Sequence, residues 1–199
     1  MIKLYHFEIS GNCHKVRLML SLLGLDYESI ILANGAHKDP AYLALHPLGQ
    51  VPLLVDDDVV IWDSQAILVY LARRYGEEWL PIAAEPMANV MQWLSVAANE
   101  IQHGLSAARL YHLLNVKLDV ELAEKKAYLA LGVLEQHLQG RQWLAGDARS
   151  IADVACFPYV ALAGDAKISL APYPNVVAWS NRIKQLPGFV GMPGISVTS

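Results

Sequence analysis

The sequence predicts an α/β domain followed by an all-helical domain, and three observations support this fold class. The chain opens with a strand-like, a helical and a second strand-like pattern, which favours a parallel strand pair joined by a right-handed crossover. Two further strand-like runs then form a hairpin that leads into another helix. We therefore expect a mixed four-stranded sheet built as βαβ followed by ββα. Beyond residue 86, every periodic segment is helical.

The opening strands are predicted over residues 2–7 and 27–32, each bounded by polar or turn-forming residues. The helix between them begins near residue 12, where apolar side chains start to recur at helical spacing, and it ends at Gly24. Residues 33–45 are expected to form an irregular polar segment, either a loop or a helix.

The hairpin lies in the stretch HPLGQVPLLVDDDVVIWDSQAILVYL, which begins at His46. Its strands are predicted over residues 53–55 and 59–62, on either side of a polar turn. Pro52 has no N–H to donate, so at the start of a strand it leaves the backbone of Val51 outside the sheet, where an extended ligand could pair with it. We expect the Val51–Pro52 peptide bond to be cis.

Two helix N-termini carry polar side chains that suit an anionic ligand. Asp63 and Ser64 precede a helix, where free N–H groups and the positive end of the helix dipole favour a carboxylate. Ser10 and Asn12 place a hydroxyl and an amide at the start of the first helix, where the dipole lowers the cost of a thiolate. Cys13 lies on the apolar stripe, so we expect it in the core. Ordinary helix capping is the alternative interpretation of both pairs.

Residues 79–86 are predicted to link the two domains, 1–78 and 87–199, because this stretch contains two prolines and has no usable period. Pro86 suits the first position of a helix. A long amphipathic pattern then extends from residue 87 to about residue 114.

Three further helices are predicted in the second domain. Asp119 is expected to cap the first of them, which ends at Gly140. Ser150 is followed three residues later by Asp153, a capping-box variant in front of an apolar run that we expect to be a buried helix. The last helix should begin at Pro174.

Composition argues against two classes of partner. Charged residues make up only 17% of the chain, below the roughly 25% that is typical, and a subunit interface would explain this shortage. The net charge of −4 and the lack of basic runs beyond Arg73-Arg74 argue against nucleic acid. The most apolar later run, residues 151–163, is too short to span a membrane. With two cysteines and no leader pattern, we expect a cytoplasmic protein.

Three stretches together give the chain a resemblance to the glutathione S-transferase superfamily, in particular to its bacterial, serine-type cytosolic members. They are SGNCHKVRLMLSLLGLDYE near the start, HPLGQVPLLVDDD with WDSQAILVYLARRYG in the middle, and GDARSIADVACFPY in the helical half. The resemblance covers nearly the whole chain. It implies a thioredoxin-like N-terminal domain that binds glutathione as co-substrate, a cleft for a small hydrophobic electrophile between this domain and the helical one, a homodimer, and no metal.

The resemblance also implies roles for individual residues. Ser10 matches the hydroxyl that hydrogen-bonds the glutathione sulfur in serine-type transferases, and Asn12 is close enough to share or replace that role. Val51 matches the residue before the family's cis-proline, which is Pro52 here. The backbone of Val51 would then pair with the cysteinyl part of glutathione. The remaining matches would hold the two ends of the tripeptide: Asp63 and Ser64 the γ-glutamyl end, and Gln50 with His37 or Lys38 the glycine end.

Three further features bear on the rest of the site. Glu8 stands where the family often has proline, which leaves the shape of the turn before Ser10 open. Gly11 stands where the isomerase branch tends to have a second serine, which disfavours that branch. The long first helix of the second domain carries a polar and aromatic cluster that we expect to line the electrophile pocket, with a solvated helix end as the alternative; its members are Arg109, Tyr111 and His112.

The leading hypothesis is therefore a glutathione transferase that attacks an electrophile with the glutathione thiolate. A second hypothesis is a glutathione-dependent disulfide reductase or peroxidase, because SGNC occupies the place of a redox C-x-x-C motif without its first cysteine. A third is a scaffold that carries hydrophobic ligands or a partner without catalysis.

Overall fold

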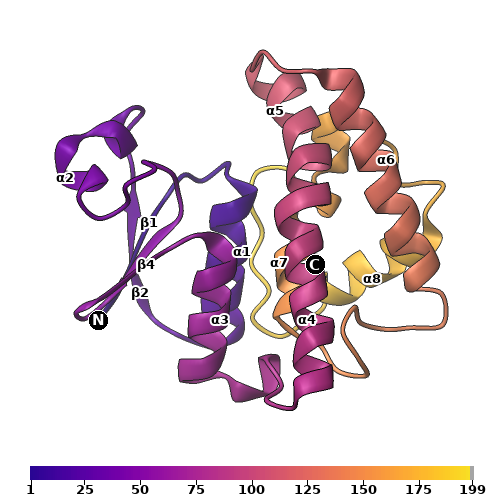
Figure 1. Ribbon diagram of the computed structural model, residues 1–199, viewed down its shortest axis with the longest axis horizontal. Helices are drawn as coiled ribbons and strands as arrows, with labels where there is room; N and C mark the ends of the chain where they lie inside the picture. The colour runs from indigo at the N-terminus through magenta and orange to yellow at the C-terminus, as the bar shows by residue number, and fades with distance from the viewer. Residues whose placement is uncertain (198–199) are drawn as a thin grey trace.

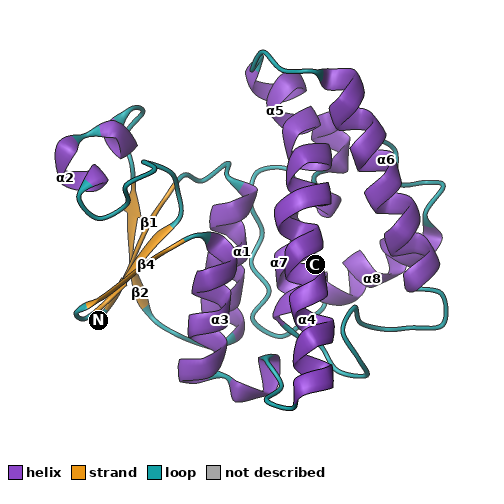
Figure 2. Cartoon of the chain, viewed as in Figure 1, coloured by secondary structure: helices purple, strands orange, loops and turns teal. Residues whose placement is uncertain are grey.

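The computed structural model describes residues 1–197 and shows a sheet-containing domain beside a helical one (Figures 1 and 2). The strands are β1 (Ile2–His6), β2 (Tyr27–Ile31), β3 (Leu53–Asp56) and β4 (Val59–Trp62). The first domain's helices are α1 (Gly11–Leu22), η1 (Ala36–Lys38), α2 (Pro40–Leu43), α3 (Ser64–Tyr75) and η2 (Glu77–Trp79). The second domain's helices are α4 (Ala84–Val96), the π-helical η3 (Ala97–Ser106), α5 (Ala107–Leu114), α6 (Val120–His137), α7 (Ile151–Ala161), η4 (Ala163–Ala166) and α8 (Pro174–Lys184).

The four strands form one mixed sheet in the order β2-β1-β3-β4. β1 and β2 are parallel, whereas β3 is antiparallel to both of its neighbours. In the register, Leu4 of β1 stands between Ser29 and Leu54. The predicted four-stranded arrangement is therefore confirmed, including the crossover through α1 and the hairpin of β3 and β4.

The two faces of the sheet are covered differently. Leu4 and Leu54 are fully buried, on the face covered by α1 and α3. The neighbouring Tyr5 points to the other face, as the alternation of strand side chains requires. There its ring meets Tyr42 of α2 edge-on, with 6.1 Å between ring centroids. Figure 1 shows α2 on the side of the sheet away from α1 and α3.

The segment 33–45, for which the sequence allowed a loop or a helix, contains η1 and α2; Pro40 occupies the first turn of α2, where no N–H is needed. Two element boundaries differ from the sequence prediction. α4 begins at Ala84, so Pro86 is its third residue rather than its first. Proline is tolerated there because the N–H groups of the first helical turn have no partner within the helix. α6 ends at His137, a few residues before Gly140.

α7 is the central element of the molecule. Its residues 151–160 are all buried, as expected, and it packs against α1, α3, α4 and η3. One apolar core consequently runs from the sheet through α7 into the helical domain. Within residues 1–197, no helix has the length and apolarity needed to cross a bilayer.

The predicted capping box at the start of α7 is confirmed. The Asp153 carboxylate accepts hydrogen bonds from the Ser150 amide at 2.9 Å, the Leu144 amide at 3.0 Å and the Trp179 indole at 2.8 Å. The Ser150 hydroxyl accepts from the Ala152 amide at 3.2 Å. Burial raises the pKa of Asp153 to about 6 in spite of these donors. This carboxylate therefore joins α7, α8 and the preceding loop.

We expect Asp153→Asn to lower the free energy of unfolding by about 1 to 3 kcal/mol at neutral pH, because its NH₂ would face the Ser150 amide donor. The wild-type pKa is 3.8 when unfolded and about 6 when folded, so this group's contribution to stability falls as pH rises through that window. The variant should lack this dependence. Urea unfolding at several pH values measures both effects, with the exposed Asp147→Asn as the control. Equal stability of Asp153→Asn and wild type would contradict the assigned role.

Candidate active site

A cavity of about 650 Å³ opens between the two domains. Seven of the residues predicted from the sequence line it together: Asn12, His37, Lys38, Gln50, Val51, Asp63 and Ser64. Another cavity, of about 570 Å³, lies within the helical domain and contains none of the predicted site residues. The interdomain cavity is therefore the candidate active site.

Two backbone segments shape the wall formed by the first domain. The Val51–Pro52 bond is cis, as predicted, and Val51 lies just before the first paired residue of β3. The preceding carbonyl, that of Gln50, accepts a hydrogen bond from the Tyr42 hydroxyl at 2.6 Å. Lys38 donates to the carbonyl of Gly49 at 2.7 Å, which ties η1 to the same turn. Pro52 itself is buried beneath the cavity wall.

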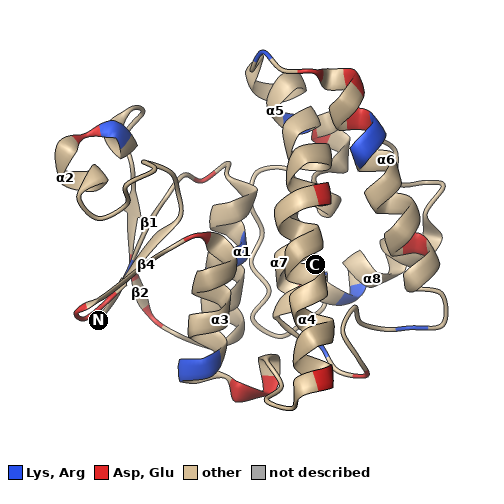
Figure 3. Cartoon of the chain, in the orientation of Figure 1, with Lys and Arg blue, Asp and Glu red and all other residues tan. Residues whose placement is uncertain are grey.

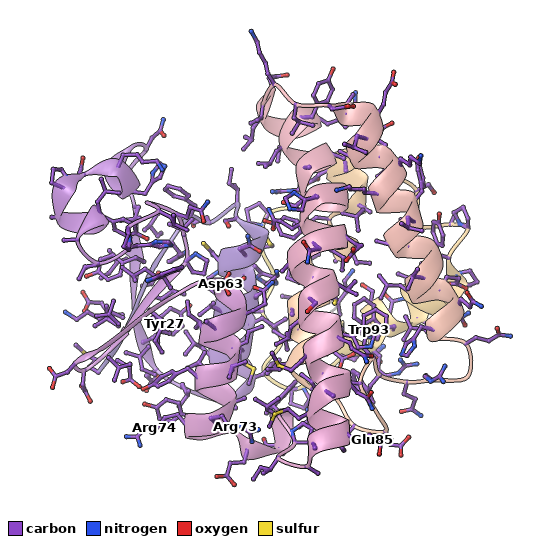
Figure 4. The ribbon with its side chains drawn as sticks, in the orientation of Figure 1. Tyr27, Asp63, Arg73, Arg74, Glu85 and Trp93 are labelled. Carbon is purple, nitrogen blue, oxygen red and sulfur yellow. The ribbon has the colours of Figure 1, made fainter. Side chains whose placement is uncertain are left out.

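Asp63 and Ser64 stand at the N-terminal end of α3 (Figure 4). The Asp63 carboxylate caps the helix by accepting from the amides of Gln65 and Ala66 at 3.0 and 3.1 Å. Its backbone has a φ of +75°, a value that L-residues rarely adopt. Ser64 donates to the Gln65 side chain. Both members of the predicted acid–serine pair face the cavity, at the end of α3 opposite Arg73 and Arg74.

The N-terminus of α1 forms the floor of the site. The Ser10 hydroxyl caps the helix by accepting from the Cys13 amide at 3.3 Å, which leaves its own proton available to a ligand. Ser10 is half-buried but is not among the lining residues, whereas Asn12 is. Cys13 is fully buried, and burial raises the pKa of its thiol. The prediction that Cys13 belongs to the core is confirmed.

The turn before Ser10 is held by a half-buried arginine rather than by a proline. Arg17 donates to the carbonyls of Phe7 at 3.1 Å and Glu8 at 2.8 Å. It also lies 2.9 Å from Nδ1 of His6, whose pKa is lowered by burial and by the charge of Arg17. Because arginine only donates, His6 accepts through Nδ1, and its Nε2 donates to the Ser29 hydroxyl at 2.7 Å.

The predicted electrophile wall of Arg109, Tyr111 and His112 needs correction. Arg109 is buried, pairs with Asp165 at 2.9 Å, and donates to the Ile9 carbonyl at 2.9 Å, so it supports the turn instead of lining the cavity. Tyr111 and His112 line a separate, smaller cavity at the far end of α5. His112 also contacts Glu124 of α6 at 3.2 Å.

The helical wall is instead built by η3, α5 and α7. It is mostly polar, and its members are Ala98, Gln102, His103, Ser106, Leu110 and Tyr159. Four of these follow one another at intervals of four residues, from 98 to 110. In a regular α-helix, which has about 3.6 residues per turn, residues spaced by four move steadily around the helix axis and do not stay on one face. The wider i→i+5 turn of the π-helical η3 brings these four residues back to the same face. The α-helical period therefore does not predict this face, and the apolar residues around Tyr159 do not distinguish it from a core residue.

Tyr159 also sets the identity of residue 11. A Cβ atom built on Gly11 would lie 2.7 Å from two carbons of the Tyr159 ring. A serine at this position, as in the isomerase branch, would require the ring to move. The fully buried Lys15 lies on the same ring, with Nζ 5.6 Å from its centroid.

The described structure thus defines a class of two-domain proteins in which a thioredoxin-like domain and a helical domain share one cavity. Family comparisons agree with this class. A glutathione S-transferase N-terminal domain model matches residues 4–79, and a glutathione S-transferase C-terminal domain model matches residues 86–187. The chain belongs to the glutathione S-transferase family.

Relatives of this chain span nearly its whole length. It is 37% identical to glutathione S-transferase 3 of Zea mays, over 94% of this chain and 91% of that protein. It is 30% identical to the disulfide-bond oxidoreductase YfcG of Escherichia coli K12, over 94% of this chain and 92% of that protein. A crystal structure of a glutathione S-transferase from Xanthobacter autotrophicus Py2 matches with a TM-score of 0.88 at 32% identity, covering 98% of each chain.

Gly11→Ala should lower the free energy of unfolding by about 1 to 3 kcal/mol, because the new methyl group would overlap the Tyr159 ring. Gly132→Ala in α6 is the matched control. A Cβ there meets nothing within 4 Å, so alanine should leave stability unchanged or raise it by about 0.5 to 1 kcal/mol. Denaturant unfolding compares the two. If the two substitutions had the same effect, the contact between Gly11 and Tyr159 would carry no energetic weight.

Proposed function

We propose that this protein is a glutathione transferase that binds glutathione along the first-domain wall and directs its sulfur toward an electrophile at the helical wall. The observation that carries this proposal is the convergence of seven matched residues, spread from position 12 to position 64, on one cavity. In this pose the γ-glutamyl carboxylate lies at the N-terminus of α3, near Asp63 and Ser64. The backbone of Val51 pairs with the cysteinyl unit, and Gln50 with His37 or Lys38 meets the glycine carboxylate.

The thiol is ionised at the N-terminus of α1. A free cysteine thiol has a pKa of about 8.5, so only a few per cent is thiolate at neutral pH. The Ser10 hydroxyl and the Asn12 amide are the two neutral donors at this helix end, and the helix dipole adds to their effect. Two free buried cysteines, Cys13 and Cys156, fit the reducing cytoplasm, the location we propose.

A second candidate function, glutathione-dependent reduction of disulfides or peroxides, is favoured by the polarity of the helical wall. Gln102, His103 and Ser106 make this wall polar, which suits a polar second substrate better than a purely hydrophobic one. The bound glutathione thiolate would attack one sulfur of the disulfide, form a mixed disulfide with it and release the other sulfur as a thiol. A second glutathione would then attack the glutathione sulfur of the mixed disulfide, which forms oxidised glutathione and releases the second thiol.

Removing a thiolate donor should raise the pKa of bound glutathione. A hydrogen bond to a charged sulfur is worth roughly 1.5 to 3 kcal/mol, or about one to two pKa units at ~1.36 kcal/mol per unit. Ser10→Ala and Asn12→Ala should each show such a rise, and the larger rise identifies the main donor. Cys13→Ser should leave this pKa unchanged while lowering stability. Ultraviolet absorbance of the thiolate against pH measures the pKa, and turnover is measured with a chlorinated aromatic acceptor.

Three outcomes would alter the proposal. Turnover of a small disulfide without turnover of the aromatic acceptor would establish the second candidate function. Loss of turnover in Cys13→Ser alone would indicate a thiol-redox enzyme. Glutathione binding without either reaction would favour a non-catalytic carrier.

We also propose a homodimer, formed through the face of α3 and α4. The stretches 64–72 and 86–99 on these helices contain no charged residue, which Figure 3 shows as uninterrupted tan ribbon. Between them lies a mostly apolar groove of about 430 Å³, where Met91 is 45% exposed. The groove shares Asp63, Gln65 and Ala98 with the interdomain cavity, so a partner seated there would lie beside the acid-binding end of the site.

Light scattering should give about twice the monomer mass of 21.9 kDa. Met91→Glu should shift the protein toward monomer, because an unpaired charge would be buried in the groove. The control is Leu129→Glu, which replaces a side chain that is 61% exposed on α6. A monomer mass for the wild type at all concentrations would refute the dimer.

A further inference from the structure

The Asn12 side chain is held from across the domain boundary. Its Nδ2 donates to Oε1 of Gln102 in η3 at 3.2 Å, and these residues are separated by 90 positions in the chain. The other end of the amide, Oδ1, is buried and has no hydrogen-bond partner among the described residues. Asn12 lines the interdomain cavity, so its side chain lies near the place where we expect the glutathione sulfur.

Gln102 is itself held by the helical domain. Its Nε2 donates to the Ser106 hydroxyl at 3.3 Å, one turn further along η3. Ser106 is buried, and it lies beside Tyr159, whose pKa is raised by burial and lowered in part by Ser106 and by the Asn12 backbone amide. Asn12, Gln102 and Ser106 thus form a hydrogen-bonded chain of neutral groups between α1 and the helical wall.

The Asn12 NH₂ carries two N–H groups. One of them donates to Gln102, so the second is left to donate to a thiolate in the cavity. Gln102 accepts from Asn12 through its oxygen and donates to Ser106 through its NH₂, and these two hydrogen bonds fix which way the Asn12 amide points.

We propose that Gln102 is a positioning residue that, with Ser106, holds the Asn12 amide so that its second N–H donates to the sulfur when bound glutathione ionises. The thiol proton leaves to water. This inference rests on the proposed glutathione-binding function. It assigns the helical domain a part in thiol activation that is separate from binding the second substrate.

The test compares Gln102→Leu with Gln92→Leu, a substitution of the same type on α4 in the cavity that contains no predicted site residue. Gln102→Leu should raise the pKa of bound glutathione by about 0.5 to 1 unit, because Asn12 loses the partner that orients it. Affinity for S-methylglutathione, which has no thiol proton, should not change. Gln92→Leu should alter neither quantity. Gln102→Met, with a similar shape and no amide, replaces the leucine variant if that variant melts at a lower temperature than wild type.

The double variant Asn12→Ala with Gln102→Leu decides whether the two residues act together. Its pKa should equal that of Asn12→Ala alone, because Gln102 acts only through Asn12. The inference is overturned if the pKa of Gln102→Leu equals that of wild type while Asn12→Ala raises it, or if the two effects add. In either case the proposed function stands. If wild type fails to bind S-methylglutathione, the proposed function fails, and the inference falls with it.

Discussion

The packing of α7 against α1 is the constraint on which the rest of the structure depends. α7 is buried along its length, so it cannot shift without opening the core of both domains. Its Tyr159 ring occupies the space beside Gly11 and thereby fixes the first turn of α1. Because α7 also packs against α4 and η3, one buried helix sets the position of both cavity walls. The site is rigid for the same reason that the core is.

The backbone entering α1 is fixed just as firmly. The carbonyls of Phe7, Glu8 and Ile9 are taken up by two guanidinium groups, those of Arg17 and Arg109, one from each domain. These contacts replace the restriction that a proline would impose at position 8. Because the turn is fixed, the hydrogen-bond donors at the start of α1 need no reorganisation when charge develops on a ligand. Such preorganisation is the main source of electrostatic catalysis. Arg109 is thus important to the site without touching the cavity.

Most features that depend on neighbours in sequence could be predicted from the sequence. The caps at Ser10, Asp63, Asp119 and Ser150 are local, because each side chain serves amides two or three residues further on. The helical wall could not be predicted, because it depends on the π-helical turn of η3. This turn lies where Gly104 approaches the backbone nitrogen of Ala127 so closely that a Cβ would be 2.6 Å away. Contacts such as that of Arg109 with Ile9 join residues 100 positions apart and leave no periodic trace.

The charges around α1 explain why neutral donors suit this site. Arg17 is occupied by backbone carbonyls, burial holds the neighbouring His6 neutral, and Lys15 lies on the Tyr159 ring. Arg17, His6 and Lys15 are all absent from the lining of the cavity. A cation beside the sulfur would lower its pKa further, but the nucleophilicity of a thiolate falls as its pKa falls. In the proposed function, an amide and a hydroxyl at a helix N-terminus would bring the thiol pKa toward ambient pH, where the product of ionised fraction and reactivity is greatest.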